Sequence, residues 1–199
     1  MIELYGSPMS SAGRTRWMLE EVGVSYEYRR VDTRAGQTRT PEYLRMYGGG
    51  TVPVLRDCDL VLGESMAINF YLAEKYGPDL LPKGLIERAQ AMQWSFWAIT
   101  MAQPDLLTVM FDGMKPKEAR KPDAVEAAKK RLIPLLAHLD QSLTGRDYLV
   151  ASRFTVADCN TGSIANIARA TGLLESLPNA RAWMERLAAR PAYQRAAKD

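Results

Sequence analysis

Residues 48–65 read GGGTVPVLRDCDLVLGES, and this stretch does most to set the architecture of the first part of the chain. Its two short apolar runs, Thr51–Leu55 and Leu60–Leu62, are separated by the turn residues Asp57-Cys58-Asp59, a pattern that predicts a hairpin. Pro53 falls inside the first run. Because proline has no N–H to donate to a strand ladder, we expect it at a sheet edge or at a position with a special backbone role.

The segments on both sides of this hairpin alternate between strand and helix patterns, which favours an α/β layer. Before it we predict a strand, a helix that Gly23 ends, a second strand and a short helix, over Ile2–Tyr5, Ala12–Val22, Val24–Val31 and Pro41–Met46. After it, Met66–Tyr76 keeps apolar residues four apart, as an amphipathic helix does. We therefore place an α/β domain at residues 1–77.

The rest of the chain shows only helical patterns. We expect a linker at residues 78–84 and an all-helical domain at residues 85–199. Within that domain, Thr155 and Asp158 have the spacing of a capping box, so a helix is predicted to start there and to run to about Ala170. Its low charge suits a helix buried in a bundle, and a site acid is the alternative role of Asp158.

Composition excludes several classes of protein. The 199 residues are 47% hydrophobic and 25% charged with a net charge of +3, which is typical of a globular protein and indicates no nucleic-acid partner. No apolar run is long enough to cross a membrane and no export segment opens the chain, so we expect a cytoplasmic protein without a membrane partner. Cys58 and Cys159 lie far apart and His138 is the single histidine, which argues against a metal site, a disulfide framework and a histidine-based triad. We expect His138 in ordinary helix packing or exposed.

Several motifs, in this order along nearly the whole chain, together resemble the cytosolic glutathione transferase family. They are Leu4-Tyr-Gly-Ser-Pro8, Arg14-Thr-Arg16, Thr51-Val-Pro-Val-Leu55, Leu60-Val-Leu-Gly-Glu-Ser65, Tyr71-Leu72 with Glu74-Lys-Tyr76, and Phe154-Thr-Val-Ala-Asp158. The resemblance implies a thioredoxin-like α/β domain followed by an all-α domain, usually in a homodimer. It also implies glutathione as the co-substrate, with no metal.

The resemblance also implies where glutathione binds. Pro53 would be cis, so that the main chain of Val52 pairs with the cysteinyl backbone of glutathione as an added strand would. Ser65 would hold the γ-glutamyl carboxylate at a helix N-terminus, where unpaired N–H groups favour an anion, and Glu64 would reach the γ-glutamyl amine. The alternatives are an edge-strand proline without a ligand and a helix cap formed by Glu64 and Ser65.

The glutathione thiol has a pKa of roughly 8.5 to 9 and needs a partner that stabilises its thiolate. The pattern Ser10-Ser-Ala-Gly-Arg14 resembles the serine-type, bacterial-like members, which makes Ser10 the catalytic residue and Ser11 a second donor. A shift of one residue exchanges the two, and Tyr5 aligns with the hydroxyl of the tyrosine-type classes. The remaining alternative is that Ser10 only caps the first helix.

The chain departs from the family pattern just before Val52. Gly48-Gly-Gly-Thr51 stands where many members carry a longer polar residue, so Thr51 takes over that contact. Arg39 lies where a basic residue often meets the glycyl carboxylate, although a solvated arginine would fit the sequence nearly as well.

The family's chemistry predicts a transferase that delivers the glutathione thiolate to a small apolar electrophile. Conjugation, peroxide reduction, dehalogenation and isomerisation all begin with that thiolate, and the sequence does not separate them. The electrophile would lie between the domains, against a helix that carries Trp94, Trp97 and Met101 on one face, although such stripes are more often core. A non-catalytic binding or regulatory module of the same fold is the alternative function.

Overall fold

The computed structural model of the chain describes residues 1–198, and contacts divide it into two compact units. The N-terminal unit comprises Met1–Leu81 together with the residues from Arg190 onward, and the helical unit comprises Pro82–Ala189. Unlike the division expected from sequence, this one assigns the last helix of the chain to the N-terminal unit. The reason is that this helix packs against the first helix, as described below.

A four-stranded sheet forms the centre of the N-terminal unit. Its strands β1 (Ile2–Gly6), β2 (Tyr26–Arg30), β3 (Val54–Asp57) and β4 (Leu60–Gly63) lie in the order β2-β1-β3-β4, with β1 parallel to β2 and the other neighbours antiparallel. Leu4 pairs with Leu55 at the centre of this sheet, and both side chains are fully buried. This topology is the thioredoxin-like arrangement that we expected.

Pro53 lies outside the strand in which the sequence pattern places it. The ladder of β3 begins at Val54, one residue after the proline, and β3 is an interior strand between β1 and β4. An interior strand uses its N–H groups on both sides, which explains why the proline, with no N–H to donate, precedes the ladder. The expectation of a proline inside a strand is therefore wrong.

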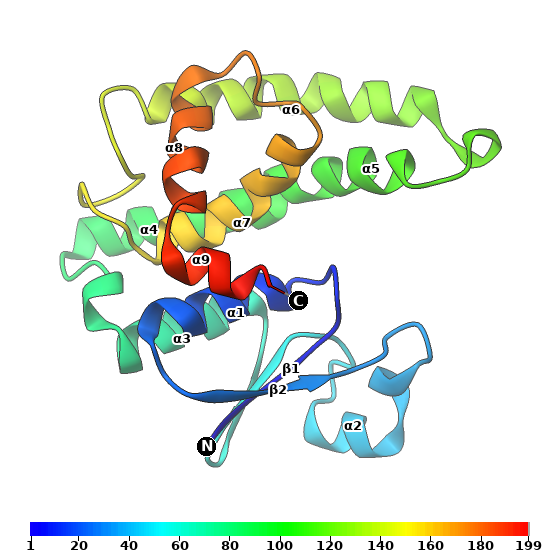
Figure 1. Ribbon diagram of the computed structural model, residues 1–199, viewed down its shortest axis with the longest axis vertical. Helices are drawn as coiled ribbons and strands as arrows, with labels where there is room; N and C mark the ends of the chain where they lie inside the picture. The colour runs from blue at the N-terminus through cyan, green and yellow to red at the C-terminus, as the bar shows by residue number, and fades with distance from the viewer. Residues whose placement is uncertain (199) are drawn as a thin grey trace. The chain divides into compact units, whose positions relative to one another are not determined.

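The helices of the N-terminal unit cover both faces of the sheet. Figure 1 shows α1 (Ala12–Val22) and α3 (Ser65–Tyr76) together on one side of the strands and α2 (Pro41–Met46) on the other. Short 3-10 turns, η1 (Gln37–Arg39) and η2 (Pro78–Leu80), lie before α2 and after α3. Gly23 ends α1 as predicted: its φ of 68° is left-handed, and its N–H donates to the Leu19 carbonyl at 3.1 Å. The last helix, α9 (Pro191–Ala196), runs beside α1.

The helical unit is a bundle in which one helix is almost wholly buried. Its main helices are α4 (Leu85–Trp97), α5 (Gln103–Gly113), α6 (Pro122–Ser142), α7 (Val156–Ala170) and α8 (Pro178–Ala188). A π-helical turn, η3 (Ala98–Ala102), joins α4 to α5, and a 3-10 turn, η4 (Lys117–Ala119), precedes α6. Helix α7 is the buried one, as its low charge predicted.

The predicted capping box at the start of α7 is confirmed. The Thr155 hydroxyl accepts the Ala157 amide at 3.2 Å, and the Asp158 carboxylate accepts the Thr155 amide at 3.0 Å. Asp158 also accepts the Leu149 amide and the indole N–H of Trp183, each at 3.0 Å. Asp158 thus connects the loop before α7 to α8 inside the core of the helical unit.

Candidate functional site

Two serines stand together where α1 begins. Ser10 donates its Oγ hydrogen to the Ser7 carbonyl at 2.6 Å and accepts the Ala12 amide at 3.2 Å. These bonds hold the start of α1 from one residue before its N-cap, which is Ser11 and makes no side-chain capping bond. Ser10 can still donate a hydrogen bond to a ligand, because a hydroxyl that accepts an amide N–H can turn its own proton toward an incoming anion.

Ser11 connects the start of α1 with the segment before β3. Its Oγ donates to the Val52 carbonyl at 3.5 Å, across 41 residues of sequence. The Val52–Pro53 peptide bond is cis, as the family resemblance implied, and Val52 lies outside the strand ladder that starts at Val54. The structure thus brings two predicted site segments together, and in it the Ser10 and Ser11 hydroxyls both donate to main-chain carbonyls.

The residues just before Val52 lie beside two side chains from the segment 37–46, one of which forms a hydrogen bond with them. The Tyr43 hydroxyl donates to the Thr51 carbonyl at 2.8 Å, and burial raises the pKa of Tyr43 to about 12, so that it stays a donor at neutral pH. Arg39 lies close to Gly50: a Cβ built there would lie 2.6 Å from its Nη1, the far end of an exposed and flexible side chain. The φ of Gly50 is 58°, a left-handed value that favours glycine at this position. Tyr43 was not predicted, because a buried aromatic residue in a short helix gives no sequence signal of this role.

Glu64 and Ser65 lie at the N-terminus of α3. Glu64 is the N-cap residue with a φ of 63°, rare for a residue other than glycine, and its side chain makes no capping bond. Ser65 begins the helix and is 3% exposed. The helix-cap alternative for Glu64 therefore has no hydrogen bond to support it. Strained backbone of this kind often marks a functional position.

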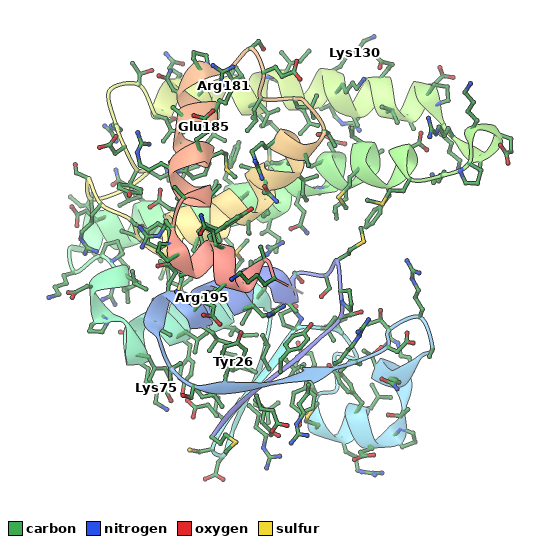
Figure 2. All side chains as sticks on the ribbon, in the orientation of Figure 1. Tyr26, Lys75, Lys130, Arg181, Glu185 and Arg195 are labelled. Carbon is green, nitrogen blue, oxygen red and sulfur yellow. The ribbon has the colours of Figure 1, made fainter. Side chains whose placement is uncertain are left out.

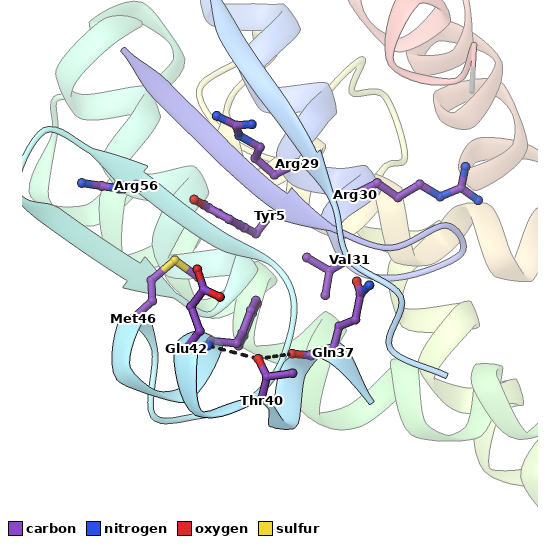
Figure 3. Close-up of a pocket in the computed structure, with 10 residues that line it drawn as sticks. Tyr5, Arg29, Arg30, Val31, Gln37, Thr40, Glu42, Met46 and Arg56 are labelled. Atoms are coloured by element: carbon purple, nitrogen blue, oxygen red, sulfur yellow. Dashed lines mark hydrogen bonds between the residues drawn. The ribbon is translucent and has the colours of Figure 1, made fainter. Parts of the chain in front are cut away.

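Tyr5, the alternative hydroxyl, faces a different part of the N-terminal unit. Its ring meets Tyr43 edge to face at 6.4 Å, and its hydroxyl donates to Glu3 at 3.4 Å. It lines a hollow of about 540 Å³ beside α2, shown in Figure 3, together with Thr40, Glu42 and other residues. In the described part of the chain, this hollow is not lined by any of the residues predicted to contact glutathione, which are Ser10, Ser11, Arg39, Thr51, Val52, Pro53, Glu64 and Ser65.

The aromatic stripe predicted for the electrophile lies within the helical unit. Trp94 and Trp97 meet edge to face at 5.2 Å, and the exposed ring of His138 from α6 stacks on Trp94 at 5.4 Å. Met101 lies beyond the start of the π-helical turn, whose wider hydrogen-bond spacing shifts the register expected for an α-helix. These contacts agree with the ordinary packing or exposure expected of His138.

Between residues 1 and 198, no three His, Cys, Asp or Glu side chains are grouped so that they could hold a metal ion. None of the helices in the same range has the length and apolar character that crossing a membrane requires.

Comparison with known proteins adds to this geometry. Residues 1–74 match the N-terminal domain of glutathione S-transferases, and residues 98–191 match their C-terminal domain. Glutathione S-transferase 3 of Zea mays is 33% identical, over 98% of this chain and 92% of its own length. Glutathione S-transferase F10 of Arabidopsis thaliana is 30% identical, over 98% and 95%.

Solved structures resemble the whole chain as well. A glutathione S-transferase-I bound with lactoylglutathione superposes with a TM-score of 0.90 at 30% identity, over 98% of both chains. A theta class glutathione S-transferase from Xanthomonas axonopodis pv. citri, with glutathione bound, superposes with a TM-score of 0.89 at 33% identity, over 100% of this chain and 97% of its own.

Proposed function

Because the chain belongs to the glutathione S-transferase family, we propose that its transferase activity depends on the Ser10 hydroxyl at the start of α1. The chain is a glutathione transferase with glutathione as its co-substrate. The contact between Ser11 and the Val52 carbonyl carries the proposal about the site. A cysteine whose main chain pairs with Val52 has its sulfur beside the hydroxyls of the α1 N-terminus.

The role of Ser10 is to keep that sulfur anionic. A hydrogen bond to a charged acceptor contributes about 1.5–3 kcal/mol, which corresponds to a decrease of roughly one to two units in the thiol pKa. The Ser10 proton turns from the Ser7 carbonyl to the sulfur, while its oxygen keeps the Ala12 amide. The positive end of the α1 dipole acts in the same direction.

The other predicted residues bind the ends of the tripeptide. Ser65 and the first amides of α3 receive the γ-glutamyl carboxylate, and Glu64 receives the γ-glutamyl amine. Val52 and Pro53 hold the cysteinyl part, while Arg39 and Thr51 hold the glycyl carboxylate, with Ser11 as the second donor to sulfur. The buried position of Ser65 and the position of Arg39 close to Gly50 support these roles.

One observation favours the second candidate function, a non-catalytic binding or regulatory module. The bond from Ser10 to the Ser7 carbonyl is short, at 2.6 Å, and has to be given up for sulfur. In a module the hydroxyl would keep this bond and glutathione would bind as the thiol.

The test compares Ser10→Ala and Ser11→Ala, with Ser7→Ala as the control because the Ser7 side chain makes an exposed contact with Thr33, and its carbonyl, which accepts the Ser10 hydroxyl, is kept in alanine. The thiol pKa of bound glutathione is read from its thiolate absorbance, beside kcat and KM. We expect Ser10→Ala to raise that pKa by about one to two units and to lower kcat about tenfold or more, with KM little changed. The same effects in Ser11→Ala alone would give the role to Ser11. A bound thiol that titrates near its free value in the unmodified protein would support the module.

The finer assignments belong to the same proposal. The serine-type subclass rests on Ser10, and the likeness to the theta class structure from Xanthomonas supports the bacterial-like part. The second substrate is a small apolar electrophile, and the protein acts in the cytoplasm. Turnover of a panel of aryl halides, hydroperoxides and isothiocyanates tests the electrophile class.

A homodimer completes the proposal, and the surface of α4 supports it. Leu85, Met92 and Phe96 recur at helical spacing along this helix, and Leu85 and Phe96 are 85% and 58% exposed. A second copy would bury this stripe, with each N-terminal domain facing the partner's helical one. Sedimentation at micromolar concentration should give a dimer, and Phe96→Glu should shift it toward monomer. A monomeric unmodified protein would contradict the proposal.

A further inference from the structure

We infer that Arg190 and α9 form a C-terminal clasp that positions helix α1, and with it the Ser10 and Ser11 hydroxyls, for work on the glutathione thiol. The clasp consists of Arg190, Tyr193 and Arg195. The inference rests on the proposed function of Ser10, and it assigns a role to Arg190 and to a helix that lies mostly beyond the second family match, which ends at residue 191.

The centre of the clasp is an ion pair whose carboxylate is nearly buried. Arg190 donates from Nε and Nη2 to the two carboxylate oxygens of Glu21, each at 2.7 Å, and Trp17 donates its indole N–H to the same carboxylate at 2.8 Å. The Glu21 side chain is only 6% exposed. A carboxylate so far from water depends on these donors, and the paired geometry of arginine fixes direction as well as distance.

Two further contacts extend the clasp along the same face of α1. The Tyr193 ring meets the buried Trp17 ring edge to face at 4.9 Å. Arg195, labelled in Figure 2, donates to the Glu20 carboxylate at 2.7 Å and to the Glu20 carbonyl at 3.1 Å. Trp17, Glu20 and Glu21 are three and four residues apart, so one side of the helix carries all the contacts.

The clasp holds the end of α1 that is remote from the site. Glu21 lies about 15 Å along the helix from Ser11, at 1.5 Å per residue. The Asn69 amide of α3 donates to the Arg14 carbonyl at 3.3 Å, so α1 stays attached there and tilts about Arg14 when the clasp is lost. Ser10 lies four residues, or roughly 6 Å, from Arg14, so a tilt of about 10° moves it by roughly 1 Å, and misplacements of that size reduce catalysis strongly. Loss of the clasp should therefore misplace the serines without removing the helix.

The clasp is formed by a segment that returns to the N-terminal unit late in the chain. The chain leaves the N-terminal unit after Leu81, forms the whole helical unit, and returns at Arg190. The helix that stabilises the position of Ser10 is thus supplied by the last part of the chain. Fragments that end before Arg190 would contain every predicted glutathione contact and still lack this support.

The test uses the full chain with Arg190→Gln, and Arg190→Lys as the conservative variant. The matched control is Arg131→Gln, because Arg131 makes a comparable two-bonded pair with Asp105 inside the helical unit. We expect Arg190→Gln to lower kcat about fivefold to tenfold and to raise the thiol pKa of bound glutathione, with KM within about twofold. Arg190→Lys should recover part of the lost kcat and of the shift in thiol pKa, and Arg131→Gln should have the same kcat and thiol pKa as the unmodified protein.

A second readout separates positioning from general stability. Amide hydrogen exchange should speed up in α1 of Arg190→Gln and not in the strands. If Arg190→Gln fails to fold, Tyr193→Ala, which keeps the ion pair, takes its place with the same expectations. An unchanged kcat and thiol pKa in the folded variant would overturn the clasp, whereas an unchanged thiol pKa in Ser10→Ala would overturn the proposed role of Ser10 instead.

Discussion

Asp57→Asn tests how the two halves of the proposed glutathione site are held in register. Asp57 is the last residue of β3 and is 4% exposed. Its Oδ2 accepts three bonds from α3: from the Tyr76 hydroxyl at 2.6 Å, the Tyr71 hydroxyl at 2.7 Å and the Lys75 ammonium at 2.7 Å. Since β3 follows Pro53 and α3 begins at Ser65, these bonds fix both site segments to each other.

The expected loss in the free energy of unfolding follows from the hydrogen bonds that asparagine keeps and those that it loses. Its amide oxygen still accepts from the hydroxyls, so each bond changes from charge-assisted to neutral, at a cost of about 1 kcal/mol. Lys75 is exposed and becomes solvated, which makes its share small. We expect Asp57→Asn to lower the free energy of unfolding by about 2 kcal/mol. Tyr76→Phe should lower it by about 1 kcal/mol, and the double variant by less than the sum.

The difference in stability between the unmodified protein and Asp57→Asn should also depend on pH. Burial by itself would raise the pKa of Asp57, but the bonds from Lys75, Tyr76 and Tyr71 outweigh it and hold the pKa well below its ordinary value of 3.8. A carboxyl whose pKa is lower in the folded state contributes stability above the unfolded value and loses it as the pH falls through the folded one. The difference between the unmodified protein and Asp57→Asn should therefore be constant near pH 7 and shrink below about pH 4.

Urea denaturation followed by circular dichroism, at pH 7 and at pH 3, measures both effects. Asp59→Asn is the matched control, because Asp59 lies in the same turn and is exposed. A loss in Asp57→Asn no larger than that in Asp59→Asn would refute the reasoning, and so would a difference that grows on acidification.

Substitutions at Asp158, Ser10 and Tyr43 should also have measurable effects. Burial raises the pKa of Asp158 to about 6, above its unfolded value, so its contribution is complete below about pH 4 and is lost as the pH rises through 6. The stability of the unmodified protein relative to Asp158→Asn should fall by about 3 kcal/mol over that range in urea denaturation. Ser10→Ala should lower the free energy of unfolding by about 1 kcal/mol because the Ala12 amide loses its hydrogen bond to the Ser10 hydroxyl, measured by thermal denaturation. Tyr43→Phe removes the donor to Thr51 and should weaken glutathione binding about threefold to tenfold in calorimetry.

Much of the fold could be predicted because it depends on local patterns. The helix over Ala12–Val22 and its end at Gly23, and the capping box at Thr155 and Asp158, follow from periodicity and from side-chain chemistry within a few residues. The position of Pro53 was harder. The sequence shows that a proline interrupts an apolar run, but only the pairing of β3 with two neighbours shows where the ladder has to begin.

The candidate site could likewise be predicted in part. The family motifs led to Ser10, Val52 and Ser65, and folding brings the first two segments within a hydrogen bond through Ser11. Tyr5 could be aligned with a catalytic hydroxyl by spacing alone. Its direction depends on the alternation of side chains along β1 and on the ring of Tyr43, neither of which spacing reveals.

The order of residues is thus enough to identify the family and most of the strands and helices, and to propose the segments that meet glutathione, because each leaves a signature among neighbouring positions. It does not show that Glu21 finds Arg190, or that one oxygen of Asp57 collects three donors from α3. Those partners are chosen by which surfaces the folded chain brings together, and a contact across 169 residues has no local pattern to announce it.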